Sequence, residues 1–363
     1  MTGTQHDRSS NHTPSSGIGM ESAGEGHWQT WYTPSTSAVD SAGDFIRKGG
    51  LVAFPTETVY GLGGDAFNSE AVARIYEVKG RPGDNPLILH IAHRSGFDEL
   101  AYNPPTYAYA LMDSFWPGPL TLVAAKQPHL PHWLGGHPKG STETIGIRMP
   151  VHPMARALVV SSGCVIAAPS ANKAGRPSPT TAEHVADDYT LGEIDMILQG
   201  VNSEIGIEST VLDVTGELPI ILRPGAITEA MIAEVTKIAF TQKNNIDDVA
   251  PRAPGMKYRH YAPKAPMVIL NGTSQNIAAY VSKSNEKKIG VLATENFNLP
   301  PNAILLTLGN DKETIAQNLF ARLRAFDKLG VDIIYAQAIP DTGLGLAIMD
   351  RMLKAAEGNV INV

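Results

Sequence analysis

Five short segments rich in hydroxyl, amide and basic side chains lie beside apolar runs of the sequence. They are residues 55–63 (PTETVYGLG), 79–90 (KGRPGDNPLILH), 144–150 (TIGIRMP), 168–180 (APSANKAGRPSPT), and the pair GIESTVLD and ILRPGAI, which offers Ser209, Thr210 and Arg223. Lysine binds phosphate as a point charge and arginine as a planar fork, whereas hydroxyl groups recognise small polar molecules. The residue types therefore predict a local anion site beside a site for a small polar ligand.

Residues 55–63 place hydroxyls and one carboxylate directly after an apolar strand. Thr56, Thr58 and Tyr60 supply the hydroxyls, and Glu57 supplies the carboxylate. Open α/β sheets bind ligands at the ends of their strands, which favours recognition of a small polar molecule here. The alternative is an ordinary turn in which the threonines bond to their own backbone.

Residues 79–90 leave a helix, pass two prolines and enter a strand. Lys79 and Arg81 are candidates for holding phosphates, and Asp84 and Asn85 are candidates for fixing the loop. His90 lies near the far end of the strand. A histidine there either binds a ligand or is a core residue whose ring nitrogens have hydrogen-bond partners within the protein.

Arg148 and residues 168–180 complete the basic set. Arg148 lies inside an apolar strand, where a charge needs a partner, and that partner is either a bound anionic group or a carboxylate of the protein. The loop of residues 168–180 gathers donors that suit the phosphates of a nucleotide. These donors are Ser170, Asn172, Lys173, Arg176, Ser178 and Thr180.

Several familiar catalytic motifs are missing from the sequence. Gly135 and Gly140 have the glycine spacing of a P-loop, but Ser141 stands where the lysine belongs, and neither G-x-G-x-x-G nor H-E-x-x-H occurs. Residues 170–173 match the S-x-x-K of acylating serines, yet K-T-G is absent. The single cysteine, Cys164, excludes an internal disulfide and a cysteine-based zinc site. We therefore expect no metal site made by the protein alone.

Composition and charge exclude several classes of protein. The 363 residues, 43% hydrophobic and 18% charged, are typical of a globular protein of about two domains. The net charge is −7, and residues 31–236 alone carry −9. Because affinity for a phosphate backbone needs dense Lys and Arg, this disfavours the main non-enzymatic alternative, an RNA-binding module. No segment is long and apolar enough to span a bilayer, and no secretory signal begins the chain, so we expect a cytoplasmic protein without membrane contact.

The sequence divides into four parts. Residues 1–35 are polar and predict a disordered tail, with ordered structure from near Ser37. Residues 36–236 predict a mixed sheet, because some strands follow each other without a helix between them. Residues 237–262, which end in PRAPGMKYRHYAP, predict a linker or lid. Residues 263–363 alternate strand and helix, which predicts a small Rossmann-like parallel sheet. One alternative is that this last part has a regulatory or docking role. In the first domain we expect strands over 51–54, 87–91, 120–125, 144–149, 165–168, 196–198, 210–214 and 220–222.

Taken together, the five segments resemble the YrdC-type domain of the threonylcarbamoyl-AMP synthases. The resemblance covers roughly residues 36–236 and rests on PTETVYGLG, K-x-R-P-x-D-N-P-L, T-I-G-I-R-M-P, A-P-S-A-N and I-E-S-T-V in the same order. Residues 237–363 resemble the longer, two-domain form of that family. The implied fold is α/β: a YrdC-type twisted mixed sheet followed by a small Rossmann-like domain.

The resemblance also implies an activity and its site. A nucleotidyltransferase of this family makes L-threonylcarbamoyl-adenylate and pyrophosphate from L-threonine, bicarbonate and ATP, with Mg²⁺ carried mainly on the ATP phosphates. Other proteins then place the group on the tRNA adenosine beside the anticodon, and a weak contact with tRNA itself stays open. The residues implied for threonine and carbamate are Thr58, His90, Arg148, Ser170 and Thr210; those implied for ATP are Lys79, Arg81, Asn85, Thr144, Asn172, Thr180 and Arg223, with Tyr261 as a lid. Lys79, Arg81 and Arg148 are the implied catalytic groups, and Arg148 is implied to pair with the amino-acid carboxylate.

Overall fold

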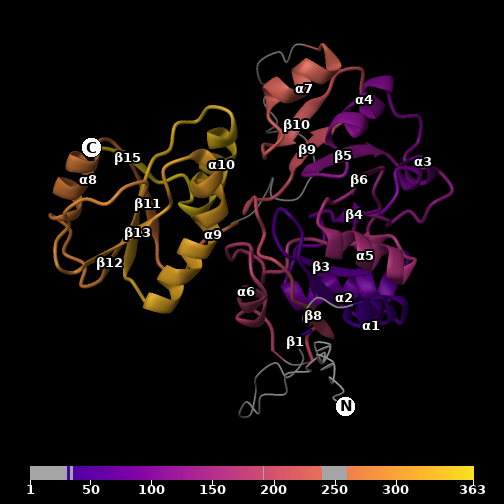
Figure 1. Cartoon of the computed structure of the whole chain (residues 1–363), viewed down its shortest axis with the longest axis horizontal. Helices are drawn as coiled ribbons and strands as arrows, with labels where there is room; N and C mark the ends of the chain where they lie inside the picture. The colour runs from indigo at the N-terminus through magenta and orange to yellow at the C-terminus, as the bar shows by residue number, and fades with distance from the viewer. Residues whose placement is uncertain (1–30, 33–35, 191, 239–259) are drawn as a thin grey trace, which may run out of the picture.

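The computed structural model describes residues 31–32, 36–190, 192–238 and 260–363, which form two α/β domains on two separate sheets. Figure 1 shows the domains side by side, the larger running from indigo to salmon and the smaller from orange to yellow. Helices α9 (Lys312–Leu329) and α10 (Leu344–Ala355) of the smaller domain face the larger one (Figure 1). Of the expected linker, residues 239–259 lie outside the described residues, as do residues 1–30 and 33–35 of the expected tail.

The larger domain is built on a ten-stranded mixed sheet of order β1-β8-β2-β3-β7-β4-β6-β5-β9-β10. Strand β3 is antiparallel to both of its neighbours, and β4 is parallel to β6 but antiparallel to β7. The expected mixed sheet is therefore confirmed. The strand bounds are β1 (Trp31–Tyr32), β2 (Val52–Phe54), β3 (Gly61–Asp65), β4 (Ile88–His90), β5 (Leu120–Ala125), β6 (Thr144–Arg148), β7 (Ile166–Ala167), β8 (Met196–Leu198), β9 (Thr210–Asp213) and β10 (Ile220–Arg223).

The helices of the larger domain begin and end at residues suited to those positions. Asn68 begins the second helix by accepting the backbone N–H groups of Glu70 and Ala71, and Gly80 ends it in the left-handed conformation. The chain therefore turns sharply between Lys79 and Arg81. The helices are α1 (Thr36–Arg47), α2 (Ser69–Lys79), α3 (Ser95–Leu100), α4 (Thr106–Phe115), α5 (Pro153–Ser162), α6 (Ala182–Ala186) and α7 (Glu229–Thr236).

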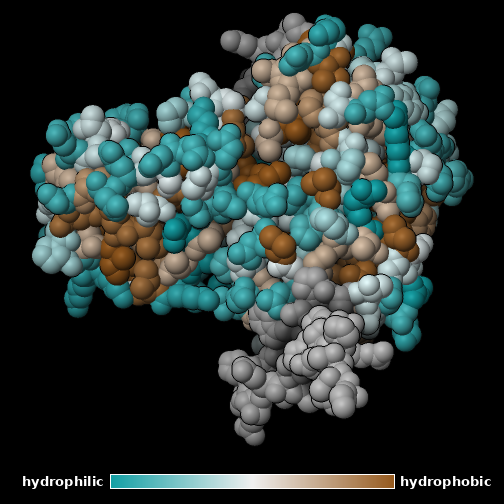
Figure 2. Space-filling view, viewed as in Figure 1, coloured by the Kyte–Doolittle hydropathy of each residue, from teal (hydrophilic) through white to brown (hydrophobic). Residues whose placement is uncertain are grey.

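The smaller domain confirms the expected Rossmann-like alternation. Its five strands are all parallel, in the order β13-β12-β14-β11-β15. Its other elements are β11 (Met267–Asn271), α8 (Ser274–Val281), β12 (Ile289–Ala293), β13 (Ala303–Thr307), β14 (Ile333–Gln337) and β15 (Val360–Asn362). Figure 2 shows apolar side chains gathered over β12 and β13, where the edge strand β13 leaves its residues half-buried. Among the described residues, no helix combines the length and the apolar character needed to cross a membrane.

Three elements were not predicted. Strand β3 contains three glycines, which disfavour strands when the sequence is considered alone. A Cβ at Gly63 would lie 2.7 Å from Cγ2 of Ile166 and 2.8 Å from Phe54, so the glycine is needed for close packing. Helix α3 is only one and a half turns long, and β1 pairs with β8 inside the stretch assigned to the tail, ahead of Ser37.

Candidate active site

One cavity of about 380 Å³ in the larger domain brings most of the candidate residues together. Of the implied site residues, the cavity is lined by Thr58, Lys79, Arg81, Asn85, His90, Arg148, Ser170, Asn172, Arg223 and Tyr261. Thr58 and Arg148 thus share one hollow with Arg81 and Asn172. The structure therefore places the groups suggested for a small polar ligand beside those suggested for phosphates.

The cavity lies over one face of the sheet rather than only at its strand ends. Ile88 and His90 both line it, and residues two apart on a strand point to the same face. Arg148 is paired with His90 across β4 and β6, and Gly61 of β3 forms a bridge to Ser170. The central strands thus hold the cavity floor, and the loops that follow them form its walls.

Lys79 fixes one wall of the cavity. Its side chain is 2% exposed, and its Nζ donates to the carbonyl oxygens of Ser170 and Asn172. Burial, followed by the charge of Arg81, lowers the pKa of the Lys79 ammonium well below its usual range. An anionic ligand beside Lys79 would favour the charged form, so the site is suited to phosphate.

Arg81 and Asn85 hold the neighbouring loop. Arg81 donates to the Asn85 carbonyl from Nε (3.0 Å), to Asn85 Oδ1 (2.8 Å) and to the Pro86 carbonyl (2.7 Å). The Tyr76 hydroxyl donates to the same Asn85 carbonyl at 3.0 Å. Burial lowers the pKa of Arg81 to about 10, so the guanidinium remains charged at neutral pH. Hydrogen bonds within its own loop therefore hold the Arg81 side chain in place.

Arg148 has a carboxylate partner in the protein. Its NH2 lies 2.5 Å from Glu57 Oε1, its NH1 donates to Thr58 Oγ1 at 2.9 Å, and its Nε donates to the Gly118 carbonyl at 3.2 Å. Burial alone would raise the pKa of Glu57, but the Arg148 guanidinium outweighs it and holds that pKa below its usual value. The alternative of a carboxylate partner within the protein is thus confirmed. Arg148 also lines the cavity, and these three contacts use three of its five N–H groups.

His90 is a buried ring that faces both the core and the cavity. Its Nδ1 lies 3.2 Å from the Ile88 carbonyl, and its ring meets Phe54 edge-on at 6.0 Å. Burial, with the nearby charge of Arg148, lowers the pKa of His90 to about 3. The ring is therefore neutral at physiological pH. With Nδ1 donating to the carbonyl, Nε2 is left as a hydrogen-bond acceptor.

The opposite wall joins the two domains. Arg223 donates from Nε to the Ser209 carbonyl at 3.1 Å, and Ser209 and Glu208 both line the cavity. Glu208 Oε2 lies 3.1 Å from Nε of Arg351, a fully buried residue of α10. The Tyr261 ring stacks beside this pair, with the Arg351 guanidinium carbon 5.8 Å from its centre. Glu208 lies in the I-E-S-T-V motif but is not among the predicted site residues, and no motif includes Arg351. Their pairing depends on how two distant parts of the chain pack.

Three implied residues do not line the cavity. The Thr210 hydroxyl is used within the protein: it donates to the Ile227 carbonyl at 2.7 Å and accepts the Ile227 N–H at 3.0 Å. Thr180 is buried, with its backbone and hydroxyl near His184 Nδ1. Thr144 lies on a separate hollow of about 740 Å³, with His137 and Lys139.

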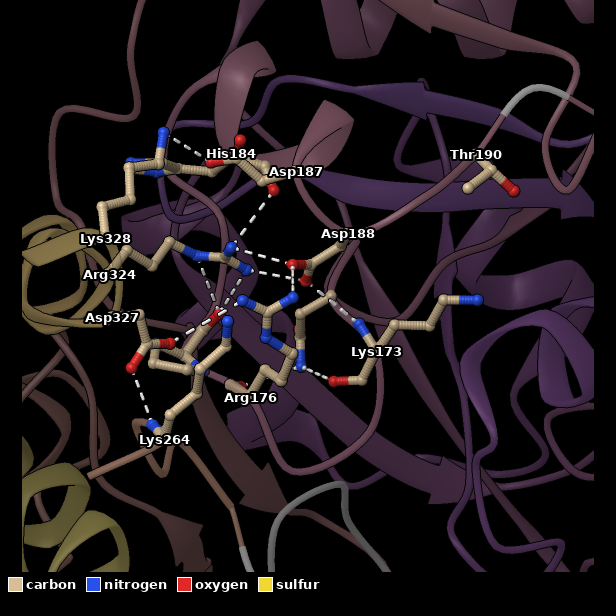
Figure 3. Close-up of polar contacts among 12 residues, drawn as sticks. Lys173, Arg176, His184, Asp187, Asp188, Thr190, Lys264, Arg324, Asp327 and Lys328 are labelled. Atoms are coloured by element: carbon tan, nitrogen blue, oxygen red, sulfur yellow. Dashed lines mark hydrogen bonds and ion pairs between the residues drawn. The ribbon is translucent and has the colours of Figure 1, made fainter. Parts of the chain in front are cut away.

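A second contact between the domains lies behind the loop of residues 168–180, and Figure 3 shows it. Arg324 of α9 is 2% exposed and donates to both oxygens of Asp188, at 3.0 and 2.8 Å, and to the Pro177 carbonyl at 2.6 Å. Arg176 lies 2.6 Å from the same Asp188 and reaches toward Asp327 of α9. These contacts attach the loop that carries Ser170 and Asn172 to the smaller domain.

The cavity is a cationic hollow inside an acidic domain. Four of its lining residues are basic, and Glu208, its one acidic lining residue, is paired with Arg351. Buried, hydrogen-bonded cations in such a hollow can neutralise a polyphosphate without reorganising. In the described part of the chain, no three His, Cys, Asp or Glu side chains come together to hold a metal.

Comparison with known proteins identifies the family of this chain. Residues 44–225 match the domain family described as Telomere recombination (Sua5/YciO/YrdC), and residues 227–357 match the threonylcarbamoyl-AMP synthase C-terminal domain. The chain is 46% identical to the threonylcarbamoyl-AMP synthase of Bacillus subtilis (89% of this chain, 94% of the relative) and 43% identical to that of Pyrococcus abyssi (89% and 95%). The structure of P. abyssi Sua5 with L-threonine superposes with a TM-score of 0.83 at 42% identity, covering 92% of this chain and 98% of that one. The chain therefore belongs to the two-domain threonylcarbamoyl-AMP synthase family.

Proposed function

We propose that the chain forms L-threonylcarbamoyl-AMP and pyrophosphate from L-threonine, bicarbonate and ATP, as a nucleotidyltransferase. The observation that carries this proposal is the single cavity that gathers buried Lys79, Arg148 and Arg223 beside neutral polar groups. The named relatives support the reaction, and the L-threonine complex of P. abyssi Sua5 supports the amino-acid substrate.

The reaction needs one carbon–nitrogen and one phosphorus–oxygen bond to form. The threonine amine adds to bicarbonate, or to its carbon dioxide equivalent, and gives a carbamate with loss of water. A carbamate oxygen then attacks the α-phosphorus of ATP, the bond to the bridging oxygen breaks, and pyrophosphate leaves. Such a transfer depends on alignment, charge neutralisation and exclusion of water more than on covalent catalysis.

The threonine and its carbamate would lie against Thr58, Arg148, His90 and Ser170. Arg148 uses one N–H each on Glu57, Thr58 and Gly118, so the rest of its five donors can meet the substrate carboxylate. Its pairing with Glu57 keeps the local charge near zero and fixes the direction of those donors. Neutral His90 would accept a hydrogen bond without adding charge to the site.

ATP would lie against the basic wall. Lys79, Arg81 and Arg223 would neutralise the phosphates, and Asn85 and Asn172 would bind polar parts of the nucleotide, with Tyr261 closing over it. Glu208, the acidic lining residue, is already held by Arg351 and by the Ser178 hydroxyl. Magnesium would therefore enter with the nucleotide, whose phosphate oxygens supply its ligands, rather than through a cage made by the protein.

The product also suggests what acts with this enzyme. A mixed carbamic–phosphoric anhydride is labile, so we expect it to pass to proteins that transfer the threonylcarbamoyl group to a tRNA adenosine next to the anticodon. The larger domain carries a net −9 over residues 31–236, so any contact with tRNA itself should be weak. We place the reaction in the cytoplasm, where ATP and newly made tRNA are available.

Pyrophosphate release under omission of each substrate tests the proposal. The purified chain should release pyrophosphate only when L-threonine, bicarbonate and ATP are all present. Replacing Arg81 by Ala should cost about 2–4 kcal/mol of transition-state stabilisation, as expected for a fixed electrostatic donor. Equal release without bicarbonate, or a rate for Arg81→Ala within a few-fold of the wild type, would contradict the proposal.

A further inference from the structure

The smaller domain has a topological switch point in its sheet. Strands β12 and β14 are neighbours, yet the chain leaves them in opposite directions: from β12 to β13 at one edge, and from β14 through α10 to β15 at the other. In open parallel sheets, loops that diverge in this way leave a crevice beyond the carboxyl ends of the two strands, where ligands bind.

A cavity of about 600 Å³ lies at this point, and we name it the switch-point cavity. It shares no lining residue with the candidate active site. Its volume is in the usual range for small-molecule sites, roughly 300–1,000 Å³. It is lined by Thr294 and Glu295 after β12, by Gln337, Ala338, Ile339 and Pro340 at the end of β14, and by Asn310, Lys312 and Ile315 at the start of α9.

The cavity has an apolar floor and an oriented amide. Ile315 and Ile339 are 4% and 5% exposed and belong to the core of the smaller domain. Oε1 of Gln337 accepts both the backbone N–H of Thr294 (3.0 Å) and its hydroxyl (3.2 Å). This fixes the amide, and within the described part of the chain Nε2 of Gln337 donates to no protein acceptor.

Glu295, the one carboxylate of the cavity lining, accepts the Ser274 hydroxyl, and the one positive charge of the lining is that of Lys312, which neutral groups hold in place. Its Nζ donates to the Thr342 carbonyl (2.5 Å) and the Thr342 hydroxyl (2.9 Å), which are both neutral. Among the described residues no carboxylate forms an ion pair with it. The neighbouring Asp311 is occupied by Thr314, whose N–H and hydroxyl lie 2.7 and 2.8 Å from its two oxygens. The helix end is thus capped already, so an anion would be held by the Lys312 side chain rather than by the helix terminus.

We propose that the switch-point cavity binds a small anionic metabolite. Its carboxylate or phosphate would meet Lys312 and Nε2 of Gln337, and its apolar part would rest on Ile315 and Ile339. This inference does not depend on the reaction at the other cavity, because the two cavities share no lining residue.

Methyl NMR of the full-length chain, labelled with ¹³C at the isoleucine δ1 methyl groups, tests the proposal. Ile315 and Ile339 report on the switch-point cavity and Ile88 on the active site, with signals assigned by the I315V, I339V and I88V variants. Four probes are titrated: AMP and pyrophosphate for phosphate, citrate and L-aspartate for carboxylate. At least one of the four probes should shift the signals of both Ile315 and Ile339 saturably, with a Kd of about 1 mM or tighter. Whether the phosphate probes or the carboxylate probes cause this shift identifies the anionic group.

Two variants show whether the shift depends on the oriented cation. Lys312→Gln should weaken that binding at least about tenfold. Lys283→Gln, at an exposed lysine outside the cavity in the same domain, should leave it unchanged. The thermal unfolding midpoint of each variant shows that it is folded. The proposal is overturned if all four probes leave Ile315 and Ile339 unshifted, if only Ile88 moves, or if Lys312→Gln binds as tightly as the wild type.

Discussion

At the scale of single residues, the candidate active-site cavity holds its charges on fixed partners. Lys79 is bound to two backbone carbonyls, Arg81 to its own loop, and Arg148 to Glu57 and Thr58. Such groups need not reorganise when a triphosphate enters, and this preorganisation is the main source of electrostatic catalysis.

Lys79 should matter for catalysis far more than a lysine just outside the cavity. Lys79→Ala should lower kcat/KM by about 30- to 1,000-fold, equivalent to about 2–4 kcal/mol. Lys173→Ala is the matched control, because Lys173 follows Asn172 but binds Glu193 instead of lining the cavity. Initial rates of pyrophosphate release measure both. A Lys79→Ala enzyme as active as Lys173→Ala would remove Lys79 from the catalytic groups.

His90 should make the fold sensitive to acid. Its pKa of about 3 in the folded chain lies below the ordinary value of 6.5, so between these pH values the unfolded chain binds a proton that the folded chain does not. Stability is therefore complete above pH 6.5 and falls as the pH drops toward 3, by up to about 2 kcal/mol at pH 5 from this residue.

The comparison of two histidine variants isolates this effect. Urea unfolding at pH 7.5 and pH 5 should show that His90→Gln loses about 2 kcal/mol less than the wild type over this interval. The exposed His129→Gln should lose as much as the wild type. An identical loss in His90→Gln and the wild type would mean that His90 is not buried as a neutral ring.

Sequence motifs identified residues close together in the chain better than those that depend on packing. Lys79, Arg81 and Asn85 are predictable because one loop carries them, and the structure places all three on the cavity. Thr210 lies one residue from the cavity-lining Ser209, but its hydroxyl binds the Ile227 backbone instead. A strand alternates its side chains, so a motif alone could not decide which of two neighbours points into the cavity.

At the scale of elements, glycines allow the close approaches that place the site. In β3 they let Phe54 and Ile166 pack against the backbone. Because glycine has a low strand propensity, the same residues prevent prediction of this strand from the sequence. Gly206 has a second such role, in the loop before β9. Its φ is +79°, and a Cβ there would lie 2.3 Å from Cα of Gln317 on α9.

Gly206→Ala should therefore loosen the contact between the domains. Strain at a positive φ alone costs about 1–3 kcal/mol, and the clash with the α9 backbone adds to it. Gly216→Ala is the control, since its nearest neighbour would be 3.9 Å away and its φ is ordinary. Urea unfolding should show a loss of at least about 1 kcal/mol for Gly206→Ala alone. Equal stability of the two variants would mean that the loop does not pack on α9 as described.

At the scale of the whole molecule, the smaller domain completes the site rather than standing apart from it. Arg351 pairs with the cavity residue Glu208, and Arg324 holds Asp188 behind the loop of Asn172. The sequence predicted both domains and their order, but these pairs join residues more than a hundred positions apart. Local patterns and motif spacing carry no information about such contacts.

Two substitutions on α9 separate a buried interdomain pair from an exposed one. Arg324→Met removes one of the two arginines that pair with the buried Asp188 carboxylate. It should lower the free energy of unfolding by about 3–5 kcal/mol. Lys328→Ala removes an ion pair to Asp187 whose lysine side chain is 63% exposed, and should cost less than about 1 kcal/mol. Denaturant titrations compare them. Similar losses of stability for the two variants would contradict a buried Arg324–Asp188 pair between the domains.

The product formed from ¹³C-bicarbonate tests the central claim most directly. Threonine, its captured carbon and the α-phosphorus must meet in one cavity, so mass spectrometry should find a single nucleotide product containing AMP, threonine and one ¹³C atom. That product should be absent when bicarbonate is withheld. A product with the mass of threonyl-adenylate and no ¹³C would show direct attack by the amino-acid carboxylate, and would contradict the account.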